Sequence, residues 1–461
     1  MKYNNEKFLV FGMKKSGTAC AEFLLSKNAV VGIFDEDEEV LSSKPCCDLV
    51  EKGAIIARNI EENEENYDER KNSLSNFDVV VLSPGVPIDN PLVVKLKKKK
   101  KRIIGEIELG YMNAKAPIIA VTGTNGKTTV STLIGKTLSE SGESSYLLGN
   151  VGTPFIKYAD ETLQTDVCVL EVSSFQLETV HLFTPHIGVM LNITEDHLDR
   201  HYNMRNYVYL KKRLFKNQRE SEWAVLNYDD ETVRGFAEDL LSEVVWFSAK
   251  TAVKGAYLKD GVIYYFDEEI LPADKLAIKG EHNIENALAA LCALKIYGVE
   301  TEDIVNSFTD FKGLKYRMEN VGVYNGVTYI NDSKATNVDS TLKAIKSINQ
   351  NAVLIMGGKS KNQDFTPVFE AIKNSNDKIK HVILTGESRF DMLKTAKKLG
   401  VTVSVVADLI TAVRLAGSTA APGEAVLFSP ATSSHDAFKD YIDRGERFNY
   451  LVRGLNEKTR G

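Results

Sequence analysis

One short segment restricts the fold of this chain more than any other feature. Residues 118–121 form an apolar run typical of a buried strand, Gly123 and Gly126 follow, and an amphipathic helix pattern begins near Lys127. Glycines let the backbone wrap closely around a phosphate, and the amides at a helix N-terminus supply positive potential for it. The segment therefore predicts an α/β unit that carries a nucleotide phosphate loop.

The side chains of this loop fit phosphate chemistry. Lys127 can reach a β- or γ-phosphate, and the hydroxyl of Thr128 can bind Mg²⁺. The spacing is a shortened GxxGKT form, because a full Walker loop needs glycine where this chain has Val121. A Gly-Lys-Thr turn without a ligand is the alternative, and the agreement of strand, loop and helix argues against it.

Short apolar runs alternate with amphipathic segments along the whole chain, which is typical of parallel α/β sheets. The 461 residues correspond to about three domains. We expect these domains at residues 1–105, 106–312 and 313–461, each of the α/β class. The strands expected from apolar runs lie at residues 8–12, 30–34, 79–82, 118–121, 167–172, 187–192, 224–227, 353–356, 382–384, 401–406 and 425–428.

Three further segments have distinct patterns. Residues 244–271 are expected to be rich in strands, with Gly261 in a hairpin turn. The polar stretch at residues 61–76 is expected to be a loop or an exposed helix. The six consecutive cations at residues 97–102 are expected to form a solvated helix face or turn.

The composition excludes several classes of protein. The net charge of −6 at pH 7 argues against a nucleic-acid binder that works through bulk positive charge. No apolar run approaches the ~18–20 residues of a membrane-spanning helix, and the N-terminal segment has no signal-peptide core. The five cysteines show neither a disulfide framework nor metal-finger spacing. We therefore expect a protein of the reducing cytoplasm with no nucleic-acid or membrane partner.

Two expected strands of the central unit end in polar side chains. Glu171 lies inside an apolar run, where an uncompensated carboxylate is unfavourable and a cation beside a nucleotide would compensate it. Asp196, His197 and Asp199 cluster after the next expected strand, a common position for ligand-binding groups in α/β units. A salt bridge from Glu171 to a lysine or arginine, and a structural role for His197, are the alternatives.

A lysine lies on the apolar side of the helix expected near residue 204. Tyr207, Leu214 and Phe215 define the apolar stripe, and Lys211 falls on the same stripe. An inward lysine is unfavourable unless it is paired or neutralised. Either its ammonium group snorkels to water, or desolvation favours the neutral amine, which can react with CO₂ to give a metal-binding carbamate.

At this point several blocks of the sequence resemble the Mur ligase family, and more closely its D-glutamate-adding branch. The resemblance covers essentially the whole chain. Residues 123–128 resemble the ATP loop of the family, which folylpolyglutamate synthases share, and residues 331–337 form the most discriminating block. The other blocks that resemble the family lie at residues 171–178, 192–200, 280–286, 429–438 and 444–448.

The resemblance implies a fold and an activity. The expected fold is α/β with an N-terminal Rossmann-like domain that binds uridine diphosphate, a central ATPase domain of P-loop type with a parallel sheet, and a C-terminal Rossmann-like domain. The expected enzyme is an ATP-dependent amide ligase that adds D-glutamate to UDP-N-acetylmuramoyl-L-alanine through an acyl phosphate, giving ADP and phosphate, in peptidoglycan precursor synthesis. ATP and two Mg²⁺ ions are the expected cofactors, and we expect a monomer.

The resemblance also implies roles for individual residues. The residues expected in catalysis are Glu171, Lys127, His197 and Lys211, and the metals are expected on Thr128, Glu171, His197 and carbamylated Lys211. The expected ATP contacts are Gly123, Thr124, Asn125, Gly126, Lys127, Thr128 and Thr129, with Asn283 and Asn286 near adenine, Arg317 at the γ-phosphate and Asp332 at the ribose.

The substrate contacts are implied in the same way. The D-glutamate contacts are expected at Lys334, Thr336, Lys361, Ser434 and Tyr441. Each of these, taken alone, is better explained as a solvated loop position, and only the joint pattern favours binding. The contacts to the uridine-linked substrate are expected at Gly12, Ser16, Gly17, Asp35, Asn150 and Gly152. Lys14 stands where many relatives have a second glycine, so the fit of this turn is an open point, and a nicotinamide fingerprint is not matched.

Three other functions remain as alternatives. A folylpolyglutamate synthase uses the same short ATP loop, but a complete α/β unit precedes the loop in this chain. A nucleotide-hydrolysing switch or motor is disfavoured by the shortened loop and by the lack of a guanine-reading motif. A non-catalytic protein that binds a sugar nucleotide is the last alternative.

Overall fold

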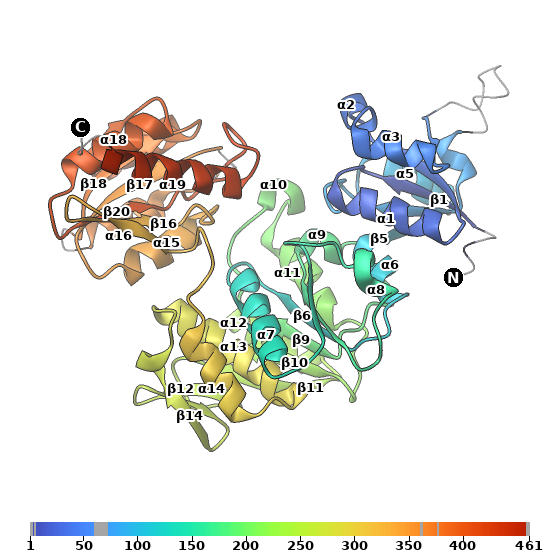
Figure 1. Cartoon of the computed structure of the whole chain (residues 1–461), viewed down its shortest axis with the longest axis horizontal. Coiled ribbons are helices and arrows are strands. Elements are labelled where there is room, and N and C mark those ends of the chain that lie inside the picture. The colour runs from blue at the N-terminus through green and yellow to red at the C-terminus, as the bar shows by residue number, and fades with distance from the viewer. Residues whose placement is uncertain (1–2, 4–5, 60–71, 360–362, 376–377, 458–461) are drawn as a thin grey trace. The chain divides into compact units, whose positions relative to one another are not determined.

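The computed structural model describes residues 3, 6–59, 72–359, 363–375 and 378–457, and the strands of this part of the chain form three sheets (Figure 1). The chain divides into two compact units. The first comprises Met1–Ile193, Arg200–Leu276 and Ile284–Asp310, and the second comprises Thr194–Asp199, Ala277–Asn283 and Phe311–Gly461.

The first sheet is parallel throughout, in the order β3-β2-β1-β4-β5. Alternate residues of its central strand point to opposite faces, so Phe8 and Val10 enter one buried cluster and Leu9 and Phe11 the other. Its strands are β1 (Lys7–Phe11), β2 (Val30–Phe34), β3 (Ile55–Ile56), β4 (Val79–Leu82) and β5 (Arg102–Gly105). Its helices are α1 (Lys15–Ser26), α2 (Glu38–Leu41), α3 (Lys44–Glu51), η2 (Leu74–Asn76), α5 (Pro91–Lys98) and α6 (Glu106–Tyr111).

The second sheet has the order β14-β13-β12-β11-β10-β9-β6-β8-β7, parallel from β7 to β12 and antiparallel at β13 and β14. Its strands are β6 (Ile118–Thr122), β7 (Ser145–Gly149), β8 (Val167–Glu171), β9 (Ile187–Met190), β10 (Trp223–Asn227), β11 (Glu243–Ser248), β12 (Gly255–Lys259), β13 (Val262–Tyr265) and β14 (Glu268–Pro272). The helices of this part are α7 (Lys127–Glu140), α8 (Ile156–Ala159), α9 (Ser174–Leu177), α10 (Leu198–His201), α11 (Met204–Lys212), η3 (Arg213–Phe215), α12 (Glu231–Arg234), η4 (Gly235–Asp239), η5 (Ala273–Lys275), α13 (Glu281–Tyr297) and α14 (Thr301–Asp310).

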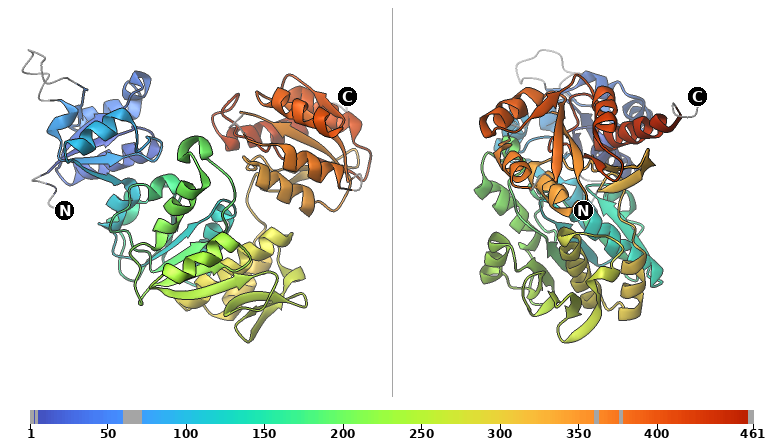
Figure 2. Two further views of the ribbon diagram at one scale, coloured as in Figure 1. Left: turned by 180° about the vertical axis from the view of Figure 1, so that it is seen from behind. Right: turned by 90° about the vertical axis from the view of Figure 1, so that its left-hand side faces the viewer.

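The third sheet, in the second unit, has the order β15-β16-β20-β17-β18-β19, antiparallel only between β15 and β16. Helices cover both of its faces (Figure 2), and two separate buried clusters lie against it. Its strands are β15 (Glu319–Tyr324), β16 (Val327–Asn331), β17 (Ala352–Gly357), β18 (Ile379–Thr385), β19 (Val403–Val405) and β20 (Ala425–Phe428), and its helices are α15 (Val338–Ser347), α16 (Thr366–Lys373), α17 (Arg389–Leu399), α18 (Leu409–Thr419) and α19 (Tyr441–Glu457).

The predicted fold class is confirmed, and the three sheets fall within the three sequence ranges expected for domains. The hairpin at Gly261 is confirmed, because Lys259 pairs with Val262. The sequence did not predict β3, β5, β7 and β15, which all lie at sheet edges, or β16, whose buried Val327 and Tyr329 alternate with Thr328 and Ile330 and form no continuous apolar run. Of the polar stretch at residues 61–76, residues 61–71 lie outside the described part of the chain.

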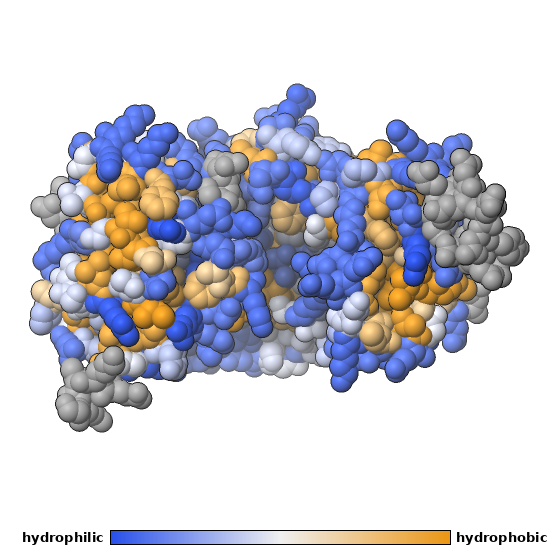
Figure 3. Space-filling view, turned by 90° about the horizontal axis from the view of Figure 1, so that it is seen from above, coloured by the Kyte–Doolittle hydropathy of each residue, from blue (hydrophilic) through white to orange (hydrophobic). Residues whose placement is uncertain are grey.

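The molecular surface carries both hydrophobic and hydrophilic side chains. Figure 3 shows one face, on which hydrophobic side chains gather in patches among hydrophilic ones. The side chains at residues 97–100 are exposed where α5 ends, as the run of cations predicts. In the part of the chain that the structure describes, every helix is too short or too polar to span a bilayer.

One glycine tests the packing of the first sheet. A Cβ at Gly32, in the middle of β2, would lie 2.2 Å from the ring of Phe77. Because added bulk in a packed core displaces its neighbours, Gly32→Ala should destabilise this sheet by about 1–3 kcal/mol. The first thermal unfolding transition should move to a lower temperature. The matched control is Gly235→Ala, where nothing lies within 4 Å of the added Cβ, and a G32A melting curve identical to that of the control would contradict this packing.

Candidate active site

The predicted phosphate loop is formed between β6 and α7. Gly123 has φ +150° and Gly126 has φ +89°, so both occupy conformations that favour glycine. A Cβ at Gly126 would also lie 2.3 Å from Oδ1 of Asn286, which places this side chain against the loop. The N-terminus of α7, at Lys127, therefore faces a cradle of backbone that fits a phosphate.

Backbone contacts hold the loop in this shape. Nζ of Lys127 donates to the carbonyl oxygens of Gly123 and Thr124 at 2.9 and 2.8 Å. Asn192, just after β9, provides a second support. Its Oδ1 accepts the backbone amide of Asn125 at 2.9 Å, and its carbonyl oxygen accepts the backbone amide of Thr124 at 2.9 Å. The sequence places Asn192 only within a family-like block at residues 192–200, and its support of the loop depends on the fold.

The buried carboxylate at the end of β8 lies at the same edge of the sheet. Glu171 is 2 % exposed, and its Oε1 accepts a hydrogen bond from Nδ2 of Asn150 at 2.8 Å. Carboxylate oxygen is a ligand type that Mg²⁺ prefers, and so is the hydroxyl of Thr128 in the first turn of α7. The donor chemistry at this edge thus fits a magnesium ion.

Lys211 is buried, as its place on the apolar stripe of α11 predicts, and snorkelling to water is wrong. The residue is 1 % exposed. Its Nζ donates to the carbonyl oxygen of Gly123 at 2.7 Å and lies 4.8 Å from the centre of the Tyr207 ring. The hydroxyl of that tyrosine is 3.2 Å from Oγ1 of Thr124. The structure therefore brings Lys211 to the phosphate loop.

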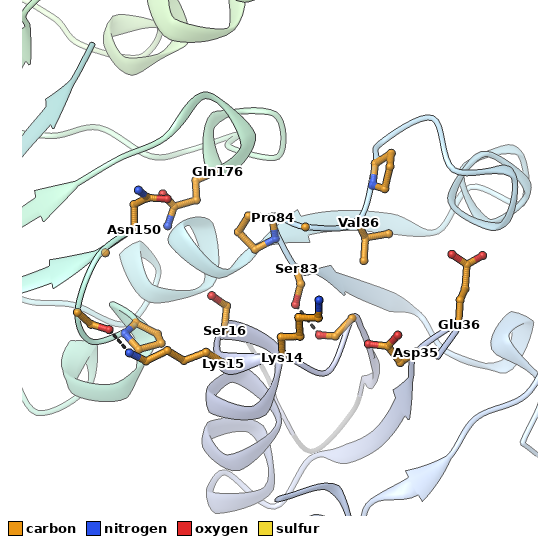
Figure 4. A pocket seen from close by; sticks show the side chains of 16 residues that line it. Lys14, Lys15, Ser16, Asp35, Glu36, Ser83, Pro84, Val86, Asn150 and Gln176 are labelled. Atoms are coloured by element: carbon orange, nitrogen blue, oxygen red, sulfur yellow. Dashed lines mark hydrogen bonds between the residues drawn. The ribbon is translucent and has the colours of Figure 1, made fainter. Parts of the chain in front are cut away.

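A pocket of about 440 Å³ opens where the first sheet meets the central one within the first unit (Figure 4). It is lined by Gly12, Lys14, Lys15, Ser16, Asp35, Glu36, Ser83, Pro84, Gly85, Val86, Pro87, Gly149, Asn150, Gly152, Pro154 and Gln176. The volume lies in the range of small-molecule sites. The N-terminus of α1 and two lysines give one side of the pocket positive charge, which suits a diphosphate.

The turn before α1 is fixed from three sides. Oδ2 of Asp35 accepts the amide of Met13 at 2.7 Å, Oγ of Ser83 donates to the Gly12 carbonyl oxygen at 2.5 Å, and Nζ of Lys15 donates to the Gly152 carbonyl oxygen. Lys14 has φ −76°, so the backbone at this position does not require glycine. Gly17 does require glycine, because a Cβ there would lie 1.8 Å from the Gly12 carbonyl oxygen.

Of the residues lining this pocket, the sequence predicted Gly12, Ser16, Asp35, Asn150 and Gly152. It missed Lys15, Glu36, Gln176 and the loop at residues 83–87. The Ser-Pro-Gly-Val-Pro sequence of this loop follows an apolar strand and was the available signal.

The remaining predicted residues belong to the second unit, and Lys361 lies outside the described part of the chain. Nζ of Lys334 lies 3.6 Å from the ring centre of Tyr441, and Ser434 is 2 % exposed. Nε2 of His197 lies 3.6 Å from Oδ2 of Asp196, beside a pocket of about 230 Å³. Arg317, Thr336 and Asn283 are partly exposed residues of the same unit.

Asp332 is a buried carboxylate at the end of β16. Its Oδ2 accepts from Oγ of Ser429 at 2.8 Å and its Oδ1 from the amide of Met318 at 3.3 Å. Burial raises the pKa of Asp332 to about 7, although these hydrogen bonds act in the opposite direction. The side chain is thus held within a fixed network rather than free in a loop.

Arg444 joins the two loops that carry predicted D-glutamate contacts. It is 2 % exposed, and its guanidinium donates to the Ser333 carbonyl oxygen at 2.8 Å and to the carbonyl oxygens of Thr432 and Ser433 at 3.1 and 3.2 Å. Burial lowers the pKa of Arg444 to about 9. The sequence placed this arginine in a family-like block but gave it no role.

Comparisons with known proteins agree along the whole chain. Family models match at residues 6–105 (Mur ligase MurD-like, N-terminal domain), 121–294 (Mur ligase middle domain) and 316–432 (Mur ligase, glutamate ligase domain). UDP-N-acetylmuramoylalanine–D-glutamate ligase from Alkaliphilus metalliredigens is 39 % identical over 99 % of both chains. The enzyme of the same description from Caldanaerobacter subterraneus is 38 % identical over 99 % of this chain and 100 % of its own.

Solved structures show the same fold at lower identity. UDP-N-acetylmuramate-alanine ligase from Thermotoga maritima has a TM-score of 0.62 at 19 % identity and covers 98 % of this chain and 100 % of its own. The MurF ligase of the same organism, solved in complex with ADP, has a TM-score of 0.59 at 14 % identity and covers 88 % of this chain and 96 % of its own.

The raised pKa of Asp332 predicts a pH dependence of stability. Because the folded state binds this proton more tightly than the unfolded state, where the pKa is 3.8, stability falls as the pH rises from about 4 to about 7. Asp332→Asn should remove this component, which is on the order of 1–4 kcal/mol. Urea unfolding midpoints of the second unit at pH 5 and pH 8 measure it. An unchanged difference between the two pH values in the variant would contradict it.

Proposed function

The chain belongs to the Mur ligase family, and we propose that it joins D-glutamate to UDP-N-acetylmuramoyl-L-alanine at the expense of ATP, giving ADP and phosphate. The observation that carries this function is the identity of 38–39 % with ligases of this description over at least 99 % of both chains. The reaction is a step of peptidoglycan precursor synthesis. The acceptor carboxylate takes the γ-phosphate to form an acyl phosphate, and the amine of D-glutamate then displaces phosphate to form the amide.

The phosphate loop supplies binding and alignment for the first step. Gly123 and Gly126 let the backbone approach the phosphates, and Lys127 places its ammonium group over the same loop. Phosphoryl transfer needs charge neutralisation and alignment more than covalent help from the protein. Asn286, whose side chain lies against Gly126, would contact the nucleotide beside the loop.

We propose two Mg²⁺ ions, which when bound neutralise charge on the transferring phosphoryl group. Thr128 and Glu171 would hold one ion, and this assignment is supported by the burial of Glu171. His197 and Lys211 would hold the other. Lys211 can do so only as a carbamate, formed when its neutral amine adds to CO₂ and loses a proton, and burial in general favours the neutral amine.

The two remaining substrates are assigned to separate parts of the chain. The pocket beside α1 would take the uridine diphosphate, supported by its two lysines and by the MurD-like model that matches residues 6–105. Lys334, Thr336, Lys361, Ser434 and Tyr441 would hold D-glutamate, Arg317 and Asp332 would contact ATP from the second unit, and Asn283 would contact adenine.

The proposal extends to the cellular compartment and the oligomeric state of the enzyme. Cys20, Cys46, Cys47, Cys168 and Cys292 are all free thiols, which supports a reducing compartment such as the cytoplasm. We propose that the enzyme acts as a monomer with its domains at residues 1–105, 106–312 and 313–461. A folylpolyglutamate synthase is disfavoured because a Mur ligase MurD-like N-terminal domain matches residues 6–105, ahead of the phosphate loop.

A substrate panel tests the function directly. Purified protein with Mg²⁺, ATP and UDP-N-acetylmuramoyl-L-alanine should release ADP with D-glutamate, and not with L-lysine or diaminopimelate. Lys127→Ala is the negative control, because loss of oriented charge at the phosphates should lower the rate about a hundredfold or more. Coupled ADP assays and mass spectrometry of the product measure both reactions. Release that depends on a different amino acid would move the chain to another branch of the family.

If Lys211 acts as a carbamate, a small carboxylic acid should restore activity to a variant that lacks this lysine. Lys211→Ala should lose activity about a hundredfold or more, because a charge that stabilises the transition state is removed. A short-chain carboxylic acid should restore part of the rate by replacing the carbamate oxygens. Lys212→Ala is the matched control, since its Nζ is paired with Asp239 at 2.5 Å at the surface and its loss should leave the rate unchanged. Absence of rescue with intact metal binding would exclude the carbamate.

A further inference from the structure

A further buried carboxylate, Glu106, lies close to the pocket beside α1 but is not among the residues that line it. Glu106 is the first residue of α6, directly after β5, and it is 1 % exposed. Nothing in the proposed reaction uses this group. Because a buried carboxylate is unfavourable without compensation, its partners indicate what it stabilises.

Those partners are parts of the pocket wall. Oε1 of Glu106 accepts the amide of Ile156 at 2.8 Å, at the start of α8. The loop that ends there, residues 150–154, contributes Asn150, Gly152 and Pro154 to the pocket. The carboxylate thus fixes the end of a loop whose other residues line the pocket.

The side chain of Gln176 is a second neighbour of this carboxylate. Burial raises the pKa of Glu106 to about 7, while the backbone of Ile156 and Phe155 and the side chain of Gln176 act in the opposite direction. Oε1 of Gln176 accepts from the amide and the hydroxyl of Ser173 at 2.9 and 3.0 Å. The amide nitrogen of Gln176 is therefore the group turned toward Glu106, whose Oε2 accepts no hydrogen bond from the described residues. Gln176 and Asn150 both line the pocket (Figure 4).

The connector that carries Glu106 is tightly packed on the same elements. A Cβ at Gly105 would lie 2.1 Å from Oγ1 of Thr179, and one at Gly110 would lie 2.4 Å from the ring of Phe155. Burial raises the pKa of the Cys20 thiol on α1, and the charge of Glu106 raises it further. The Glu106 carboxylate is thus enclosed by α1, by the loop before α8, and by α9 with the residues that follow it.

We infer that Glu106 is a positioning residue for the uridine-linked substrate, because its carboxylate holds the end of the loop at residues 150–154 and faces the side-chain amide of Gln176, and both of these line the pocket. This inference rests on the proposed function, since it assigns the pocket to that substrate. Glu106 does not touch the substrate itself. It acts through the pocket wall, so it governs binding of the acceptor rather than the chemical step.

The variant Glu106→Gln separates this role from packing, since it keeps the shape of the side chain. Its amide oxygen can still accept from Ile156, but its NH₂ group then faces the NH₂ group of Gln176, and two donors cannot pair. The dissociation constant and the KM for UDP-N-acetylmuramoyl-L-alanine should rise about tenfold or more. The KM for ATP and the kcat should change less than about threefold, since only ground-state binding of the acceptor is affected.

The matched control is Glu108→Gln on the same helix. Glu108 is also 1 % exposed, and its carboxylate accepts the amides of His181, Leu182 and Phe183 at 2.9, 2.7 and 3.1 Å. These residues are not among those that line the pocket. E108Q should therefore lower stability but leave acceptor binding unchanged, and equal loss of acceptor binding in E106Q and E108Q would overturn the inference.

A compensating change gives a readout that general destabilisation would not produce. In E106Q/Q176E the carboxylate introduced at position 176 can accept from the side-chain amide introduced at position 106 while it keeps the hydrogen bonds from Ser173. The double variant should bind the acceptor more tightly than the sum of the single effects allows, and additive effects would overturn the inference. Calorimetric titration of wild type separates the two proposals: wild type that does not bind the acceptor contradicts the proposed function, whereas tight binding by both wild type and E106Q contradicts only the role of Glu106.

Discussion

A charged group that leaves water must find compensation inside the protein, and this constraint shapes the loops of the structure. Lys211 is compensated by the Gly123 carbonyl oxygen, Glu106 by the Ile156 amide, and Arg444 by carbonyl oxygens of residues 333, 432 and 433. Each partner is the backbone of a loop that carries expected substrate contacts or, for Ile156, of the residue where such a loop enters α8. Buried charge therefore fixes loop backbone at the places where binding needs fixed geometry.

The parallel sheets explain why these loops meet. The strands β6, β8 and β9 are neighbours and run in the same direction, so the segments after Thr122, Glu171 and Met190 emerge at one edge of the central sheet. The phosphate loop, the buried carboxylate and Asn192 come from these three segments. Ligand sites at the carboxyl ends of strands are a general property of α/β folds. Strand order therefore brings the phosphate loop, Glu171 and Asn192 to the same edge of the central sheet.

Local patterns predicted much of this arrangement. The phosphate loop was predictable because strand, glycines and helix are adjacent in the chain, and the inward direction of Lys211 followed from helix periodicity. The strand β5 was not predictable, because Arg102–Gly105 begins in a run of cations and has only two apolar side chains. The pocket residues Lys15 and Gln176 were also missed, because neither has a distinctive local pattern and they come from different elements.

The sequence by itself determined the α/β class, the phosphate loop and the family, because these depend on residues close together in the chain or on blocks that stand in a fixed order. Only the tertiary structure decided what the buried charges contact. The Lys211–Gly123 hydrogen bond joins residues 88 positions apart, and that between Glu106 and Ile156 joins residues 50 positions apart. Such pairs form when sheet packing brings distant segments together, and no local periodicity specifies which carbonyl or amide will be within reach.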